Sequence, residues 1–295
     1  MTIKIVTDSS IQLTTAEQER YDIHIVPLTI QQGAESFVDG QTITRAEFLS
    51  RLQSATTEFP TTSQPTVGSF VELYDQLGAD GSTILSIHCT GLLSGTIEGA
   101  HTAAQQSTSD VHVIDSKEID RGLAYQVVAA AQDVEAGKTL TEIIAHLNEV
   151  RSKTETYVFL DSLDALQRGG RISRMAGLLT KLIKLKVIVR LTDTELEVIA
   201  KGRGLKTFTK EINNIREHLA TQDVAEIGIS HVGITDELSA KIQATLEQTQ
   251  PHVPYTVALT SPVIMSHVGL GAFGFFTLRN SITKERLHET FFFCV

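Results

Sequence analysis

The stretch STILSIHCTGLLSGTIEGAHTAAQQSTSDVHVIDS, residues 82–116, decides the fold class. It begins with a β-rich apolar run, passes through a turn rich in Gly and Ser, continues as a helix-compatible segment and ends in a second apolar run. A strand, a helix and a strand in this order make a parallel strand pair with a crossover helix. We therefore predict an α/β fold with a parallel sheet in the first half of the chain.

The flanking segments extend this alternation. Before the quoted stretch, the sequence predicts strand 3–10, helix 14–22, strand 23–31 (IHIVPLTIQ) and helix 44–53. After it come two long helices, one over residues 122–137 that ends at Gly137 and one over residues 139–155.

The pattern changes near Ser152. The alternation of strands and helices ends there, and a hairpin is predicted over residues 186–204. Further on, strands 224–233 and 255–269 (YTVALTSPVIMSHVG) flank a helix over residues 235–248. We divide the chain into an N-terminal α/β domain, residues 1–152, and a C-terminal α/β domain with a hairpin, residues 153–295.

The composition restricts the function. The chain has 295 residues, 25 Lys and Arg against 35 Asp and Glu, and a formal net charge of −10. An acidic surface argues against binding of a nucleic-acid backbone, which needs clustered cations. The two cysteines, Cys89 and Cys294, form no CxxC pair, so they predict reduced thiols and neither a zinc site nor a redox motif.

Targeting signals are not visible. The N-terminus, MTIKIVTDSS, has the pattern of a first strand and not of a signal peptide. The most apolar segment, AGLLTKLIKLKVIVRL, is interrupted by Lys181, Lys184 and Lys186 and falls short of the roughly 20 apolar residues of a membrane helix. We expect a cytoplasmic protein without an integral membrane segment.

The turn GLLSGT within the quoted stretch joins a strand to a helix, so it predicts either a helix cap or an anion site. Ser94 is placed to cap the helix or to donate its hydroxyl to an anion, and Gly95 would allow a close approach to the backbone. The nucleotide motif GxxxxGK[ST], the nucleophile motif GxSxG and the dinucleotide motif GxGxxG are all absent here.

Three further polar loops each have either a structural role or a binding role. The first, FPTTSQPTVGSF (residues 59–70), holds hydroxyls between two prolines, with Thr66 as a predicted N-cap. The second, SPVIMSHVGLGAFGFF (residues 261–276), places His267 as a structural side chain or as a donor to a carboxylate. The third, SLDALQRGGRISRMAG (residues 162–177), is a solvated turn or a local basic patch.

Taken in order, these motifs resemble the DegV family, whose fatty-acid-binding members are called FakB. The resemblance covers the whole chain and is carried by IVTDSS, FPTTSQPT, GLLSGT, VIDSKEIDRGLAYQ, LQRGGRIS and SPVIMSHVGLGAFG. It implies two α/β domains with a tunnel between or beside them that holds one fatty acid. It also implies that no further cofactor is bound and that the carboxyl group is presented to a separate ATP-dependent kinase subunit of the FakA type.

The resemblance also assigns residues. Thr62, Ser94 and His267 match the family positions that bind the carboxylate, supported by Ser63, Gly95 and Thr96. Basic residues linked to the kinase correspond to Arg171, Arg174 and Arg203. The chain departs from the family pattern at three positions, where Val67 stands for a proline, Ala124 for a glycine and Leu270 lies inside the last glycine pair.

Two other functions are weighed against this one. A stand-alone hydrolase or acyltransferase would use Ser94 as nucleophile and His267 as base, but the sequence offers no convincing third member. Phosphoryl transfer by this chain alone is disfavoured because the nucleotide motif is missing.

Overall fold

The computed structural model describes residues 2–54, 58–175 and 185–280. Its first half is built on a parallel sheet in the order β2-β1-β6-β7. The strands are β1 (Ile3–Asp8), β2 (Ile23–Val26), β6 (Thr83–His88) and β7 (Val111–Asp115). The quoted stretch supplies β6, helix α4 (Thr96–Gln106) and β7, so the predicted parallel arrangement is confirmed.

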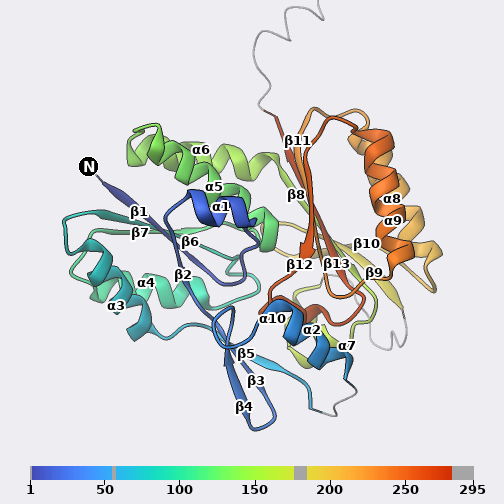
Figure 1. Cartoon of the computed structure of the whole chain (residues 1–295), viewed down its shortest axis with the longest axis horizontal. Helices are drawn as coiled ribbons and strands as arrows, with labels where there is room; N and C mark the ends of the chain where they lie inside the picture. The colour runs from blue at the N-terminus through green and yellow to red at the C-terminus, as the bar shows by residue number, and fades with distance from the viewer. Residues whose placement is uncertain (1, 55–57, 176–184, 281–295) are drawn as a thin grey trace, which may run out of the picture.

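Helices cover both faces of this sheet (Figure 1). Helices α3 (Val67–Gly78) and α4 pack on one face, around Val6 and Ile84, while α5 (Asp120–Glu135) and α6 (Leu140–Lys153) pack on the other, around Ile5 and Leu85. Alternate strand residues therefore belong to different cores, as expected of a buried parallel sheet. The short helix α1 (Thr15–Arg20) begins with a capping box between Thr14 and Glu17.

The second half forms a mixed sheet in the order β10-β9-β8-β13-β11-β12, in which only β11 and β12 pair in parallel. Its strands are β8 (Thr154–Leu160), β9 (Lys186–Leu191), β10 (Leu196–Gly202), β11 (Val224–His231), β12 (Tyr255–Leu259) and β13 (Phe273–Arg279). Helices α8 (Lys206–Leu219) and α9 (Asp236–Thr249) cover one face, where they bury Phe159. The alternate residues Val158 and Leu160 point to the other core.

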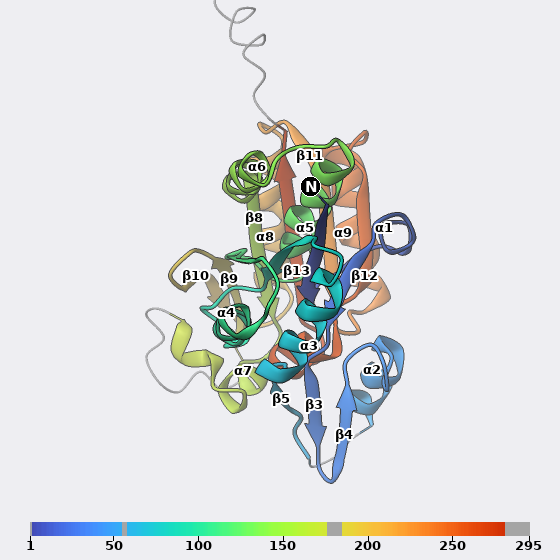
Figure 2. The same cartoon turned by 90° about the vertical axis from the view of Figure 1, so that its left-hand side faces the viewer.

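Small elements lie below the two large sheets. A three-stranded antiparallel sheet has the order β4-β3-β5, and Figure 2 shows its β3–β4 hairpin extending away from the rest of the molecule. These elements are β3 (Thr29–Gln32), β4 (Glu35–Val38), β5 (Thr61–Ser63), α2 (Arg45–Gln53), α7 (Asp164–Arg168), a 3₁₀ turn (Arg171–Arg174) and α10 (Pro262–Val268).

Two predicted strands were wrong in part. Residues 23–31 form two strands in different sheets, because Pro27, which has no N–H to donate, follows β2 directly. Residues 255–269 form β12 and then helix α10. Here Ser261 caps the helix by accepting a hydrogen bond from the Ile264 amide, Pro262 takes the first helical position, and Gly269, at φ 76°, follows the last turn.

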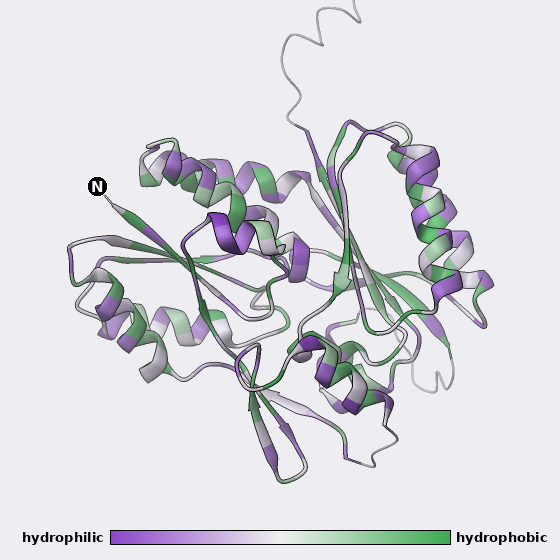
Figure 3. Cartoon of the chain, viewed as in Figure 1, coloured by the Kyte–Doolittle hydropathy of each residue, from purple (hydrophilic) through white to green (hydrophobic). Residues whose placement is uncertain are grey.

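The two large sheets come from separate parts of the chain, and helix α5 contacts strands of both. The division into domains at residue 152 stays a prediction. Apolar residues concentrate on the strands and on the helix faces that meet them (Figure 3). Within the described ranges, no helix is long and apolar enough to cross a membrane. Cys294 and residues 176–184 of the lysine-interrupted segment lie outside those ranges.

Candidate functional site

A cavity of about 360 Å³ lies where α10, the three-stranded sheet, the turn before α4 and the inner face of the six-stranded sheet meet. Its volume falls in the roughly 300–1,000 Å³ range of small-molecule sites. Its apolar lining consists of Leu28, Leu93, Ile119, Val158, Leu160, Leu166, Val189, Leu196, Val263, Ile264 and Val268. The remaining lining residues are Ser10, Thr62, Ser63, Gln64, Cys89, Ser94, Gly95, Arg171 and His267.

The histidine and the threonine predicted from distant motifs are in direct contact. His267 lies in the last turn of α10, and its Nε2 is 2.7 Å from Oγ1 of Thr62 on β5. Both side chains are half-buried and line the cavity. This bond joins positions separated by 205 residues, so the two loops form one wall.

The double-glycine turn brings a cation to the same wall. A Cβ on Gly169 would lie 2.4 Å from Nδ1 of His267, so only glycine allows this approach. The Gly169 carbonyl accepts a hydrogen bond from Nη1 of Arg171 at 2.7 Å, and the Leu93 carbonyl accepts one from Nε at 3.0 Å. Gly170, at φ 76°, makes the left-handed turn between them. The guanidinium is thus fixed beside the loop that carries Ser94.

Ser94 precedes α4 and partly satisfies its first amide. Its Oγ accepts a hydrogen bond from the Thr96 amide at 3.3 Å and lies 2.8 Å from Oγ1 of Thr96. The space above Gly95 is filled by Gln64, whose Oε1 would lie 2.1 Å from a Cβ there. The missing side chain at Gly95 therefore lets the loop of Thr62 pack on the loop of Ser94.

The charge of this wall comes from arginine and not from histidine. Burial, together with the positive charge of Arg171, lowers the pKa of His267 to about 4, so the imidazole is neutral at pH 7. Its Nδ1 is buried without a hydrogen-bond partner among the described residues. Burial also lowers the pKa of Arg171, which stays charged, and no ion pair joins it to a carboxylate in the part of the chain that the structure describes. A carboxylate in the cavity would meet an unpaired cation.

Some of the site residues predicted from the sequence line the cavity and others do not. Thr62, Ser63, Ser94, Gly95 and His267 line the cavity. Buried Thr96 contacts Ser94 from behind and does not line it, whereas Arg174 and Arg203 are exposed outside it.

Sequence reasoning missed several lining residues. Arg171, assigned to a partner surface, lies in the cavity wall, and so do Gln64, Cys89 and Ser10. All four lie inside stretches quoted in the sequence analysis. Ser10 carried a usable signal, because it ends the turn after β1, at the same sheet edge as the turn after β6.

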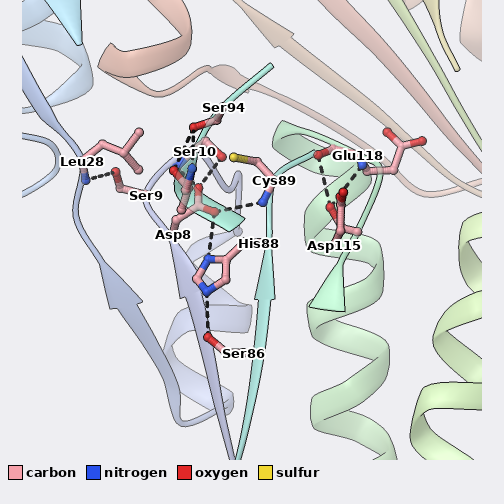
Figure 4. A network of polar contacts seen from close by, with 12 residues as sticks. Asp8, Ser9, Ser10, Leu28, Ser86, His88, Cys89, Ser94, Asp115 and Glu118 are labelled. Carbon is pink, nitrogen blue, oxygen red and sulfur yellow. Dashed lines mark hydrogen bonds and ion pairs between the residues drawn. The ribbon is translucent and has the colours of Figure 1, made fainter. Parts of the chain in front are cut away.

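A Ser–His–Asp arrangement lies next to the lining residues Ser10 and Cys89 (Figure 4). His88 has Nδ1 3.1 Å from Oδ2 of Asp8 and Nε2 2.7 Å from Oγ of Ser86. All three side chains have no solvent exposure and none lines the cavity. Asp8 also accepts hydrogen bonds from the Ser10 and Cys89 amides. Burial raises the pKa of Asp8, but the contact with His88 and the hydrogen bonds from the Ser10 hydroxyl and the Cys89 amide outweigh it, so that the pKa is lowered. The arrangement therefore joins the ends of β1 and β6 and offers no accessible nucleophile.

A metal centre finds no support. No group of three His, Cys, Asp or Glu side chains is placed to hold a metal ion anywhere in residues 2–54, 58–175 or 185–280.

A family model described as "Uncharacterised protein, DegV family" matches residues 2–280. The chain belongs to the DegV family. A DegV domain-containing protein of Streptococcus pneumoniae is 40% identical over 273 residues, which cover 92% of this chain and 96% of that protein. One from Staphylococcus aureus is 35% identical over 276 residues, covering 93% of this chain and 98% of that protein.

Solved DegV structures share the fold. The chain is similar to Bacillus subtilis DegV, described as a fatty acid binding protein, with a TM-score of 0.86 and 28% identity over 95% of this chain and all (100%) of that chain. It is also similar to a DegV family protein of Thermus thermophilus, whose structure is described by its fatty acid binding. There the TM-score is 0.81 and the identity 28%, again over 95% of this chain and 100% of that one.

Proposed function

We propose that this protein binds a long-chain fatty acid in the cavity, with the carboxylate among Thr62, Ser94 and His267. The observation that carries the proposal is the lining, which is apolar over most of its residues and has linked polar side chains on one wall. A fatty acid needs one such polar contact region and a long apolar surface. The similarity to the fatty-acid-binding DegV proteins of B. subtilis and T. thermophilus supports the same ligand class.

The two parts of the lining have different roles. About sixteen methylenes at ~0.8 kcal/mol each give more than 10 kcal/mol of gross burial, so the apolar surface supplies most of the affinity. The polar wall fixes the orientation. Neutral His267 and the two hydroxyls donate hydrogen bonds, while Arg171 supplies the positive charge that favours an ionised head group.

The proposal extends to delivery. We infer that the bound carboxylate is phosphorylated by a separate ATP-dependent kinase subunit of the FakA type, since the sequence has no nucleotide motif of its own. Arg171 and Arg174 share one 3₁₀ turn, with the first in the cavity wall and the second exposed. Exposed Arg203 adds a second cation for an acidic partner surface.

Ligand extraction tests the binding step. The purified protein is denatured and extracted, and the extract is examined by mass spectrometry for long-chain fatty acids. The delipidated protein is then titrated with palmitate and oleate. We expect release of a fatty acid and saturable rebinding at one site per chain. If no fatty acid is released and the delipidated protein binds none, the proposal is refuted.

A coupled assay tests delivery. Arg174→Glu should retain fatty acid binding and reduce phosphorylation by an added kinase subunit, because the substitution reverses an exposed charge outside the cavity. Ser94→Ala should weaken ligand retention itself. Unchanged coupled turnover with Arg174→Glu would remove this residue from the partner surface.

The hydrolase alternative has less support. No hydrogen bond joins Ser94 to His267 in the described structure, where the serine contacts Thr96 and the histidine contacts Thr62. Turnover of a p-nitrophenyl acyl ester by the isolated protein, lost in Ser94→Ala, would favour that alternative.

A further inference from the structure

Asp120 is a buried acidic residue that the proposed site does not use directly. It begins α5, is 2% exposed, and adopts a left-handed backbone conformation at φ 55°. Its carboxyl group accepts hydrogen bonds from the hydroxyls of Ser230 on β11 and Thr260 after β12. Its backbone carbonyl accepts a hydrogen bond from the Gln12 amide at 3.3 Å. One residue therefore joins three segments that are distant in sequence.

Each of these segments continues into the cavity wall. Gln12 follows the turn that contains Ser10, and Ile119, which lines the cavity, is the neighbour of Asp120 itself. Thr260 immediately precedes Ser261, the residue that caps α10. The seven-residue helix then carries Ile264 and His267 on to the cavity. A hydrogen-bonded helix moves as a rigid unit, so the position of its first residues sets the position of its last turn.

We propose that Asp120 is a positioning residue that holds the start of α10 and thereby places the imidazole of His267 against Thr62 and the carboxylate. This inference rests on the proposed fatty-acid function. The Thr260 hydroxyl transmits the restraint, whereas Ser230 holds the opposite side of the same carboxyl group to the six-stranded sheet.

The backbone conformation of Asp120 and the burial of its carboxyl group both cost free energy, and this cost favours a functional role for the residue. A left-handed conformation is unfavourable for a residue with a side chain, although Asp and Asn tolerate it best. A buried carboxyl group also costs free energy unless its hydrogen bonds are complete. An apolar side chain at position 120 would avoid the cost of burying a carboxyl group, but it would not fix the position of α10 relative to β11.

Head-group selectivity separates positioning from general stability. The ratio of the dissociation constants for hexadecan-1-ol and palmitate is measured at pH 7.5, because the two ligands share a chain length and differ in the head group. We expect Thr260→Val and Asp120→Gly to lower this ratio about tenfold, the range of a hydrogen bond to a charged group. Glycine accepts the left-handed conformation without strain, so Asp120→Gly keeps the fold while removing the carboxyl group.

Two matched variants complete the test. Ser230→Ala removes only the bond to the sheet and should leave the ratio within twofold of the wild type. Asp120→Asn keeps both the tolerance for φ 55° and a hydrogen-bonding side chain, and should restore the ratio. Circular dichroism confirms that each variant is folded before it is titrated.

The outcomes are distinguishable. If the wild-type protein binds neither palmitate nor the alcohol, the proposed function fails. If it prefers palmitate, and both Thr260→Val and Asp120→Gly keep that preference, the function stands and Asp120 has no positioning role. An equal loss of selectivity in Ser230→Ala would also overturn the inference, since the restraint would then not pass through Thr260.

Discussion

At position 169 a side chain would collide with the imidazole of His267, because an added Cβ would lie 2.4 Å from Nδ1. The same residue holds Arg171 through its carbonyl oxygen. The double-glycine turn is therefore the point where the neutral imidazole and the cation of the site meet. Small changes here should act on ligand binding more than on folding.

We expect Gly169→Ala to weaken palmitate binding at least tenfold while lowering the free energy of unfolding by only about 1–2 kcal/mol. Binding is measured by titration and stability by urea denaturation. Gly137→Ala is the matched control, because Gly137 has φ 73° and open space around its missing side chain. It should cost a similar stability and leave affinity unchanged. Equal affinities in both variants would contradict this role of Gly169.

The pKa of His267 predicts a pH dependence of stability in the ligand-free protein. Its folded value of about 4 lies below the unfolded value of 6.5, so between these limits the unfolded chain binds a proton that the folded chain does not. Stability should therefore fall as the pH drops from 6.5 to 4, by about 3 kcal/mol from this residue.

His267→Gln is the comparison for that measurement, because glutamine has no titrating group. Urea denaturation of both proteins is followed at pH 7.5, 5.5 and 4.0. As the pH falls, the free energy of unfolding of the wild type should decrease more than that of the variant. Parallel curves would show that His267 titrates normally.

The resemblance to the DegV motifs selected Thr62, Ser94 and His267, and the structure places all three in the lining of one cavity, while their role as carboxylate ligands stays a prediction. The motifs did not place Arg171 in the cavity, since a turn with three arginines has the same pattern whether a given guanidinium points inward or outward. Its direction depends on the carbonyls of Leu93 and Gly169, and the first of these is 78 residues away.

At the scale of elements, α10 shows where pattern reasoning failed. Its apolar run was taken for a continuation of β12, although Ser261, Pro262 and Gly269 are the start and stop signals of a helix. Seven residues are too few for the helical period to stand out from a strand. The longer helices α5, α6 and α9 were predicted from their sequence patterns and α1 from its cap, whereas α8 was not predicted.

The segment between β7 and α5 predicts a second pH effect, opposite in sign to that of His267. Glu118 is 6% exposed and its carboxyl accepts a hydrogen bond from Thr156, and burial raises its pKa to about 8. Between pH 4.5 and 8 the unfolded chain loses this proton while the folded chain keeps it, so stability falls as the pH rises.

We expect Glu118→Gln to remove this slope and to stabilise the protein at pH 7.5 by roughly 2–4 kcal/mol. Glutamine still offers an oxygen to Thr156. Urea denaturation at pH 5.0 and 7.5 measures the difference. A gain of the same size at both pH values would show that ionisation of Glu118 is not the cause.

At the scale of the molecule, Arg121 of α5 joins α1, the helix between β1 and β2 of the parallel sheet, to β11 of the six-stranded sheet. It is 2% exposed and donates to Glu17 of α1 at 2.7 Å from both Nη atoms, and to Glu226 of β11 from Nε at 2.9 Å. Removing it would take the guanidinium away from two partly buried carboxylates, of which Glu17 would keep only its capping-box hydrogen bond from the Thr14 amide. Such losses cost roughly 3–5 kcal/mol when a buried pair is broken.

We therefore expect Arg121→Met to lower the free energy of unfolding by roughly 3–5 kcal/mol at pH 7. The surface pair of Arg20 and Glu135, 3.0 Å apart, provides the control. Arg20→Met should lower the free energy of unfolding far less than Arg121→Met, because water and salt screen an exposed ion pair. If the two substitutions cost the same, Arg121 does not link α1 to β11 energetically.

The alternation of strands and helices predicted the parallel sheet and its crossovers, and the hairpin of β9 and β10 was also foreseen. The pairing of β8 with β13 was not, because strand partners that lie between 114 residues (Phe273 and Phe159) and 124 residues (Leu278 and Thr154) apart leave no local signal. For the same reason the cavity, which collects residues from Ser10 to Val268, appears only in three dimensions.

The buried contact of Ser86, His88 and Asp8 has a consequence for how hydrolases are recognised. A search of structures for three side chains at the right separations would retrieve this chain. Water and substrate, however, do not reach the Ser86 hydroxyl, since all three side chains have zero exposure. A search for catalytic triads by interatomic distance therefore also has to require that the serine hydroxyl is exposed to solvent. This protein is an example that such a requirement would exclude.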